Sequence, residues 1–133
     1  MPKFVDGDNI YVGTDLIYGK AAIDAMVFPT PVYSEATLNA GKTIVTLYFD
    51  KPIFRAVATD VLLKAAVTVA TDGTTFAALG ASDTVAIASN TIVVTFNLAL
   101  TLATNKLKVA ADAVMNAVGV KNTLVTTAAI DAS

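Results

Sequence analysis

The chain contains no cysteine, no histidine and no tryptophan among its 133 residues. Without cysteine and histidine it cannot form a disulfide, a thiolate nucleophile, a Cys/His zinc site or a Ser-His-Asp triad. A domain of this length buries roughly two-thirds of its unfolded surface, so one hydrophobic core can stabilise it unaided. The composition therefore predicts one non-enzymatic domain without a cofactor.

Charge is also scarce, since charged residues make up 15% of the chain and its formal net charge is −2. The pI near 4.8 leaves no basic field to attract phosphate groups, so nucleic acid is not an expected partner. No apolar run reaches the 18 or so residues of a membrane helix, and the first residues lack the pattern of a secretory signal. We therefore expect no membrane partner and a protein that begins in the cytoplasm.

Two short motifs resemble ligand-binding motifs, but each lacks a residue that the motif requires. Gly41-Lys42-Thr43 ends like a phosphate-binding loop, yet Ala36 stands where that loop needs its first glycine and the following residues alternate like a strand. Asp6 and Asp8 place carboxylates at alternate positions, as calcium sites do, but Ile10 occupies the third ligand position. The sequence thus predicts a turn at the first motif and an acidic turn, with no metal, at the second.

Residues 1–34 differ in composition from the rest of the chain, and we expect them to form an irregular N-terminal arm. Glycine and proline interrupt it every few residues, and a weak helical pattern over Lys20–Phe28 ends at Pro29. Five of the chain's aromatic residues lie here: Phe4, Tyr11, Tyr18, Phe28 and Tyr33. Two interpretations stay open, because these rings can cap the sandwich of their own chain or anchor the arm on a neighbouring protein.

Residues 35–133 are rich in valine, threonine, isoleucine and alanine that alternate between turns every ten residues or so, which predicts an all-β sandwich. Asp72-Gly73 and Ser89-Asn90 are expected to be hairpin turns. The expected strands are Thr43–Phe49, Ala65–Ala70, Thr74–Leu79, Thr84–Ala88, Thr91–Leu98, Lys106–Val109 and Thr123–Ile130.

Three local predictions concern the direction of side chains and the choice between helix and strand within residues 35–133. Alternation predicts that four side chains of one strand point together into the core: Ile92, Val94, Phe96 and Leu98. Asp60–Ala70 fits a helix or a strand, and its threonine and valine favour a strand. Lys108–Val118 also fits either, with a helical turn around Asp112–Asn116 as one outcome.

The middle of the chain is nearly free of charge. Between Lys64 and Lys106 there is no base, and the acids are Asp72 and Asp83. One interpretation is a lightly polar sheet surface built from threonine and alanine. The other is a sheet face that neighbouring subunits cover, because weakly charged sheet surface favours association.

The strand sequences of the body resemble those of bacterial immunoglobulin-like repeats in surface-layer, adhesion and motility proteins. Ile44–Ile53 is similar to their opening strand, and Asn90–Phe96 resembles a later strand after a short polar turn. Lys106–Val109 with the turn that follows resembles their closing strand, although Gly119 follows Asn116 instead of preceding it. The resemblance implies an immunoglobulin-like β-sandwich that presents surfaces and does not catalyse.

A lone module of this kind with an added arm also looks like a phage virion component. The resemblance therefore implies a structural virion protein, most simply a capsid decoration or cement protein. It would bind the major capsid protein or another virion protein on the capsid exterior as a homo-oligomer, with a trimer favoured. The arm anchors would be Phe4, Tyr11, Tyr18, Phe28 and Tyr33.

Two alternatives remain. One is an immunoglobulin-like module of a bacterial cell-surface, surface-layer or adhesion protein. The other is a carbohydrate-binding module, which needs exposed aromatic side chains on one face. In the body, the aromatic residues available for that role are Tyr48, Phe54 and Phe76.

Overall fold

The computed structural model describes residues 29–133 in full and, before them, the backbone of three short strands. These strands, β1 (Lys3–Asp6), β2 (Asn9–Val12) and β3 (Asp15–Tyr18), form an antiparallel sheet of their own. The arm therefore contains short strands. The helix predicted over Lys20–Phe28 falls outside the described residues.

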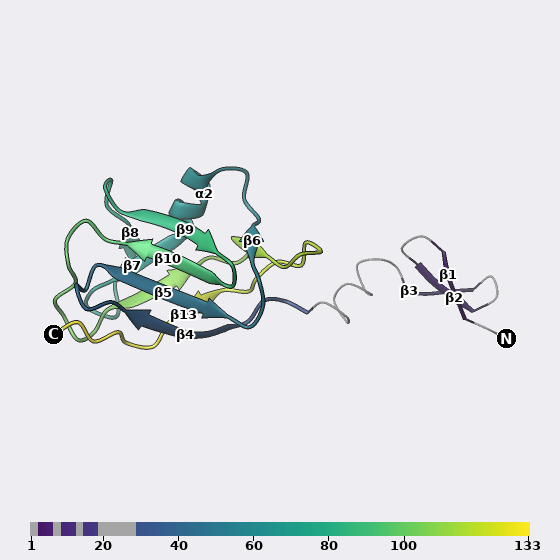
Figure 1. Ribbon diagram of the computed structural model, residues 1–133, viewed down its shortest axis with the longest axis horizontal. Helices are drawn as coiled ribbons and strands as arrows, with labels where there is room; N and C mark the ends of the chain where they lie inside the picture. Colours follow the sequence, from purple (N-terminus) through teal and green to yellow (C-terminus); the bar gives the residue numbers. More distant parts are fainter. Residues whose placement is uncertain (1–2, 7–8, 13–14, 19–28) are drawn as a thin grey trace.

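The body is built from two four-stranded antiparallel sheets (Figure 1). Sheet 1 has the order β4-β5-β10-β9 and sheet 2 the order β13-β11-β7-β8. The strands of sheet 1 are β4 (Tyr33–Leu38), β5 (Ile44–Phe49), β9 (Thr84–Ala88) and β10 (Thr91–Thr95). Those of sheet 2 are β7 (Val67–Ala70), β8 (Ala77–Ala78), β11 (Lys106–Val109) and β13 (Val125–Thr126). A short pair joins β6 (Phe54–Arg55) to β12 (Val114–Met115).

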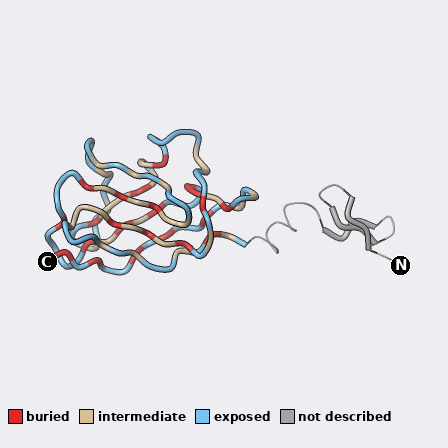
Figure 2. The backbone as a smooth tube through the Cα atoms, viewed as in Figure 1, coloured by how far each residue is buried: buried red, intermediate tan, exposed pale blue. Residues whose placement is uncertain are grey.

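The core lies between the two sheets, and every second residue of β5, β10 and β11 is buried there (Figure 2). Sheet 1 contributes Val45, Leu47, Phe49, Ile92 and Val94, and sheet 2 contributes Val67, Leu107, Val109 and Val125. These residues belong to one hydrophobic cluster. Because the body consists mostly of antiparallel strands with little helix, its predicted all-β character is confirmed.

Turn residues account for the hairpins that the sequence predicts. Ser89 adopts a left-handed conformation, with φ of 55°, in the turn between β9 and β10. Gly73, with φ of 80°, lies in the turn between β7 and β8. At Lys42, also left-handed, the chain turns into β5, and the Asn39 carboxamide accepts hydrogen bonds from the next two backbone N–H groups. The glycine-lysine motif is therefore a turn, as predicted.

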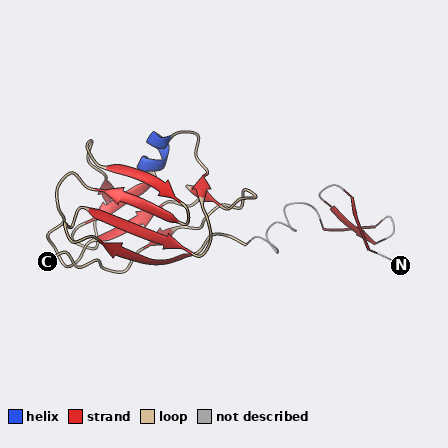
Figure 3. Cartoon of the chain, in the orientation of Figure 1, coloured by secondary structure: helices blue, strands red, loops and turns tan. Residues whose placement is uncertain are grey.

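The strand favoured for the first part of Asp60–Ala70 is wrong. Residues Asp60–Ala65 form a helix, α2, and β7 begins only at Val67 (Figure 3). The Thr59 hydroxyl accepts the N–H of Leu62 at 3.2 Å and so caps the helix N-terminus. No helix in the described part of the chain is long and apolar enough to cross a bilayer.

Two further local predictions also differ from the structure. Leu98 is 79% exposed rather than buried, because β10 ends at Thr95 and the Asn97 N–H turns to the Asp83 carboxylate at 2.8 Å. No helical turn forms around Asp112–Asn116, since Asp112 has a left-handed φ of 63° and the chain then enters β12. That short strand pairs with β6, a partner about sixty residues away that local sequence cannot specify.

The sandwich begins earlier than residue 35. Tyr33 and Ser34, placed at the end of the arm by the sequence, are the first residues of β4. Ahead of them, Val32 exchanges two hydrogen bonds with Asp50: its N–H donates to the carboxylate and its carbonyl accepts the Asp50 N–H, each at 2.9 Å. Pro29 is also tied down, because its carbonyl accepts the Asn116 side-chain amide at 3.2 Å.

Candidate functional site

The outward side of sheet 1 is the most extensive regular surface of the sandwich. Its members follow from the strand register, since residues facing a buried partner point inward and their neighbours point outward. We call this surface the sheet 1 face; it consists of Glu35, Thr37, Ile44, Thr46, Tyr48, Thr84, Ala86, Ala88, Thr91, Val93 and Thr95. Glu35, on the edge strand β4, is the only charged residue among them.

Apart from Tyr48 and Glu35, the side chains of the sheet 1 face are short, and they form rows across the sheet. Thr46 is paired with Val93 and Val93 with Ala86, while Thr91 is paired with Tyr48 on one side and Ala88 on the other. Five threonines, two alanines, a valine and an isoleucine give a weakly polar surface on which Glu35 is the one charged side chain. Apart from Glu35 at its edge, such a surface can bury area against another protein without desolvating ions.

Sheet 2 presents a different outward side. Lys106 and Lys108 of β11 alternate with buried Leu107 and Val109, as the sequence predicts. The Lys108 ammonium lies 4.0 Å from the centre of the Phe76 ring, a cation–π contact. Within residues 29–133, neither lysine forms an ion pair. Charge thus distinguishes the two sides of the sandwich.

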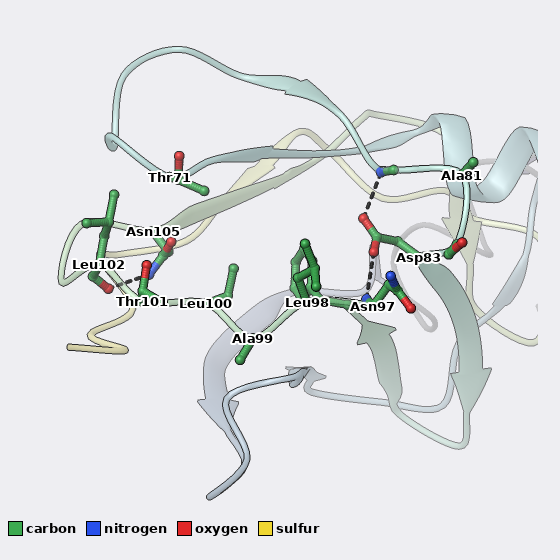
Figure 4. Close-up of a pocket in the computed structure, with 13 residues that line it drawn as sticks. Thr71, Ala81, Asp83, Asn97, Leu98, Ala99, Leu100, Thr101, Leu102 and Asn105 are labelled. Atoms are coloured by element: carbon green, nitrogen blue, oxygen red, sulfur yellow. Dashed lines mark hydrogen bonds between the residues drawn. The ribbon is translucent and has the colours of Figure 1, made fainter.

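A groove of about 480 Å³ opens between two loops that lead into and out of the β9-β10 hairpin (Figure 4). The Asp83 carboxylate connects the loops, because it accepts the N–H of Gly80 at 2.7 Å and the N–H of Asn97 at 2.8 Å. Leu98 and Leu102 line the groove and are both exposed. Asp83 therefore has a structural role, because it holds the two loops together. Asp83 is the only acid that lines the groove.

A second groove, of about 400 Å³, lies beside β9. Phe54 and Arg55 of β6, Asp60 and Leu63 of α2, and the middle of β9 line it. Arg55 and Asp60 form an ion pair, so their charges compensate each other. The groove therefore borders the edge of sheet 1 with apolar groups and one neutralised pair.

Two acids of the described residues, Asp72 and Asp50, accept hydrogen bonds from backbone N–H groups. Backbone N–H groups of Thr75 and Thr74, at 2.8 and 2.9 Å, lower the pKa of exposed Asp72 to about 2. Partial burial opposes ionisation of Asp50, but the Val32 N–H and the Lys51 ammonium outweigh it and keep its pKa below the ordinary value. No group of three or more acids that could hold a metal ion occurs in this part of the chain.

The structure describes only some of the predicted arm anchors. Phe4 of β1 and Tyr11 of β2 are register partners, and Tyr18 ends β3, whereas Phe28 falls outside the described residues. Tyr33 lies in β4, where its ring packs edge-on against Phe49 with centroids 6.3 Å apart. Burial raises the pKa of Tyr33, with Glu35 adding to the effect. Its ring is thus part of the sandwich.

The remaining sequence candidates are scattered or outside the described part. Tyr48 is on the sheet 1 face, Phe54 borders the second groove and Phe76 contacts Lys108 on the other sheet, so these rings form no common platform. Asp8 lies outside the described residues, and only the backbone of Asp6 is described. That this turn binds no metal therefore stays a prediction.

Sequence reasoning missed a set of buried amides that fix the loops. Asn105, Asn116 and Asn122 are at most 3% exposed. The Asn122 carboxamide accepts the N–H groups of Ala113 and Val114 and donates to the carbonyls of Ala110 and Thr123. Asparagine is mostly exposed in proteins, so nothing in the sequence marks these positions as buried.

No protein-family model matches the chain, and no characterised protein matches it in sequence. Among solved structures, the chain is similar to a carbohydrate acetylesterase from Xanthomonas citri, with a TM-score of 0.54 and 13% identity. The similarity covers 81% of this chain and 26% of the esterase chain, so this chain spans about a quarter of that protein's length. At this identity the comparison bears on the fold alone.

Proposed function

We propose that the chain is a non-enzymatic structural protein that binds other proteins through the sheet 1 face. The observation that carries this proposal is the near absence of charge on that face, where Glu35 is the single ionised group. Burying such a surface costs little desolvation, whereas the lysine-bearing side of sheet 2 would lose hydration of its ammonium groups. Sheet 1 is therefore the side expected to meet a partner.

The strand order supports an immunoglobulin-like identity for the sandwich. If β4, β5, β7 and β8 are equated with strands A, B, C and C′, then β9, β10, β11 and β13 take the places of D, E, F and G. The sheets then read A-B-E-D and G-F-C-C′, an order found in immunoglobulin-like folds. We therefore include this fold family in the proposal.

Within this class, the resemblance of the strand sequences leads us to a phage virion role. The chain would be a decoration or cement protein on the capsid exterior, with the major capsid protein as partner. The sheet 1 face would contact the shell or further copies, and the N-terminal arm would extend the contact. Binding to the assembled shell, and not to free subunits, would stabilise the particle by mass action.

Fractionation of the producing organism tests this role. Particles induced from a prophage, purified on a density gradient and analysed by peptide mass spectrometry should contain the chain in fixed ratio to the major capsid protein. Recovery in the cell envelope instead would contradict the virion role and favour the alternative, an immunoglobulin-like module of a surface-layer or adhesion protein. Absence from both fractions would contradict both roles.

A pair of variants tests the face itself. Thr46→Lys places an ammonium in the middle of the sheet 1 face, on the central strand β5. Thr123→Lys adds the same charge at an exposed loop residue outside that face. The first variant should bind particles at least tenfold more weakly than the wild type, and the second should bind normally. Equal binding by both would rule out the face.

Removal of residues 1–28 tests the arm. The cut leaves Pro29 and Val32, whose backbone groups bond to the sandwich, in place. The shortened chain should fold and lose particle binding. Full binding by the shortened chain would remove the arm from the mechanism without affecting the role of the sheet 1 face.

A further inference from the structure

The groove of about 480 Å³ beside the β9-β10 hairpin, here called the hairpin groove, contains a buried hydrogen-bond acceptor without a donor. Asn105 lines this groove and is 1% exposed. Its side-chain nitrogen donates to the carbonyls of Leu102 and Ile130, and these two acceptors fix which end of the carboxamide is the nitrogen. The carboxamide oxygen accepts no hydrogen bond within residues 29–133.

The Asn105 oxygen is reached through the hairpin groove. Among the described residues, every fully enclosed side-chain oxygen or nitrogen has a hydrogen-bond partner. An oxygen without a partner is therefore accessible from outside, and the hairpin groove is the opening that Asn105 lines. Figure 4 shows the carboxamide at one end of the groove, with its nitrogen turned to Leu102. A ligand that brings an N–H or O–H group to this oxygen satisfies it without breaking a hydrogen bond of the protein.

One wall of the hairpin groove also carries unpaired backbone groups. Leu98, Ala99 and Thr101 line the groove, and none of their backbone N–H and C=O groups forms a hydrogen bond within residues 29–133. Strand β9 pairs with the preceding stretch of chain only as far as Thr95, so it does not continue beside these three residues. An extended segment in that place can add backbone hydrogen bonds as a further strand does.

Apolar side chains border the same groove. Leu98 is 79% exposed and Leu102 is 48% exposed, although both are leucines on an otherwise well-packed sandwich. The volume of the groove lies within the range of roughly 300 to 1,000 Å³ that is usual for ligand sites. The five residues from Leu98 to Leu102 span at most about 18 Å. The groove therefore has the dimensions for a segment of about five residues.

We propose that the hairpin groove binds an extended peptide segment of a partner protein, with apolar side chains and without acidic residues. One backbone N–H of the segment donates to the Asn105 oxygen, and its apolar side chains contact Leu98 and Leu102. Its remaining backbone groups pair with those of the groove wall. Asp83 is the only acid that lines the groove and no base lines it, so an acidic segment is repelled.

A peptide fits this groove better than a sugar or a single small amide. A small amide can satisfy the Asn105 oxygen, but it leaves the backbone groups of Leu98, Ala99 and Thr101 without partners. A sugar offers hydroxyl groups but no apolar side chains for the exposed leucines. Only a chain with repeating N–H and C=O groups matches both the side-chain acceptor and the wall.

The hairpin groove is separate from the sheet 1 face, because no residue belongs to both. The inference goes beyond the proposed function and does not rest on it. Thr46→Lys, which is expected to weaken particle binding, should leave peptide binding unchanged. The two proposals can therefore fail separately.

An array of capped hexapeptides provides the first test on the full chain. The probes alternate valine, leucine or isoleucine with threonine or serine, and acetyl and amide caps remove the terminal charges. The wild-type chain should retain some of them, and fluorescence anisotropy then measures the best probe in solution. Leu98→Lys should bind this probe at least tenfold more weakly. Leu124→Lys, at another exposed leucine outside the groove, should bind it like the wild type.

Backbone chemistry and nuclear magnetic resonance provide the second test. The same hexapeptide with N-methylated backbone nitrogens cannot donate and should bind at least tenfold more weakly. On addition of the unmodified probe, the signals of the Asn105 side-chain amide and of the Ala99 and Thr101 backbone amides should shift, whereas that of Thr46 should not. This readout leaves Asn105 unsubstituted, because its amide holds Leu102 and Ile130 in place.

The outcomes separate the possibilities. An array without a retained hexapeptide, or equal binding by Leu98→Lys and the wild type, overturns the proposal. Binding that survives N-methylation shows that backbone donors are not recognised and also overturns it. If N-methylacetamide shifts the Asn105 signal but no hexapeptide binds, the groove is a site for small amides and not for peptides. Circular dichroism checks the fold of Leu98→Lys, and Leu98→Ser, which should also weaken binding, is the second variant.

Discussion

Removing the Asn122 side chain should cost a large part of the stability of the sandwich. In Asn122→Ala, four hydrogen bonds of 2.8 to 3.0 Å disappear at a residue that is 2% exposed. At about 1 kcal/mol net for each bond, and with some water entering the space, the loss is about 3 to 5 kcal/mol. A domain of this size has roughly 5 to 15 kcal/mol in total.

Urea denaturation measures this loss directly. With an m-value near 1.5 kcal/mol/M, the midpoint should fall by about 2 to 3 M. The control is Asn97→Ala, because Asn97 is exposed and its side chain forms no hydrogen bond within the described residues. The control should stay within about 0.5 kcal/mol of wild type. If Asn122→Ala lost no more than the control, the buried amide would not be what holds these loops.

Three further predictions concern stability. Leu107→Ala removes a fully buried side chain and should lower the free energy of unfolding, measured in urea, by about 2 to 5 kcal/mol. Leu98→Ala, at an exposed position, should lower it by less than about 0.5 kcal/mol. Equal losses would refute the burial pattern. In thermal melts, Gly73→Ala should lower the melting temperature more than Gly119→Ala. Both glycines have positive φ, but only at Gly73 does the new Cβ meet a carbonyl oxygen, that of Thr104, at 3.0 Å. The reverse order would contradict the geometry. The pKa of Asp72 is lowered to about 2 from 3.8, so its stabilising effect is present above pH 4 and is lost as the pH falls toward 2; the stability gap between wild type and Asp72→Asn should shrink over that window, and a constant gap would refute the assignment.

The sequence was a good guide to most features that depend on neighbours along the chain. Period-two alternation located β5, β9, β10 and β11, and turn residues located the hairpins at Gly73 and Ser89. Helix α2 was missed because threonine and valine were weighed as strand formers. A local signal existed: Thr59 as N-cap, with Asp60 in the first turn and Lys64 in the last turn.

Other features depend on contacts that no local pattern contains. β12 forms because its partner is β6, and β10 ends early because Asp83 captures the Asn97 N–H. The candidate surface was predicted only as an uncharged middle region; its identity as one face of sheet 1 depends on which strands pair. In particular, β4 joins that face through pairing with β5, and no strand was predicted there.

Binding of the Thr46→Lys variant to purified particles tests the central claim most directly, because the account describes a sandwich whose sheet 1 face, with Glu35 as its single charged residue, associates with protein. In co-sedimentation with the particles, the wild type and Thr123→Lys should bind equally well, and Thr46→Lys should bind at least tenfold more weakly. Equal binding by all three chains would contradict the account, because the sheet 1 face would then not be the contact surface.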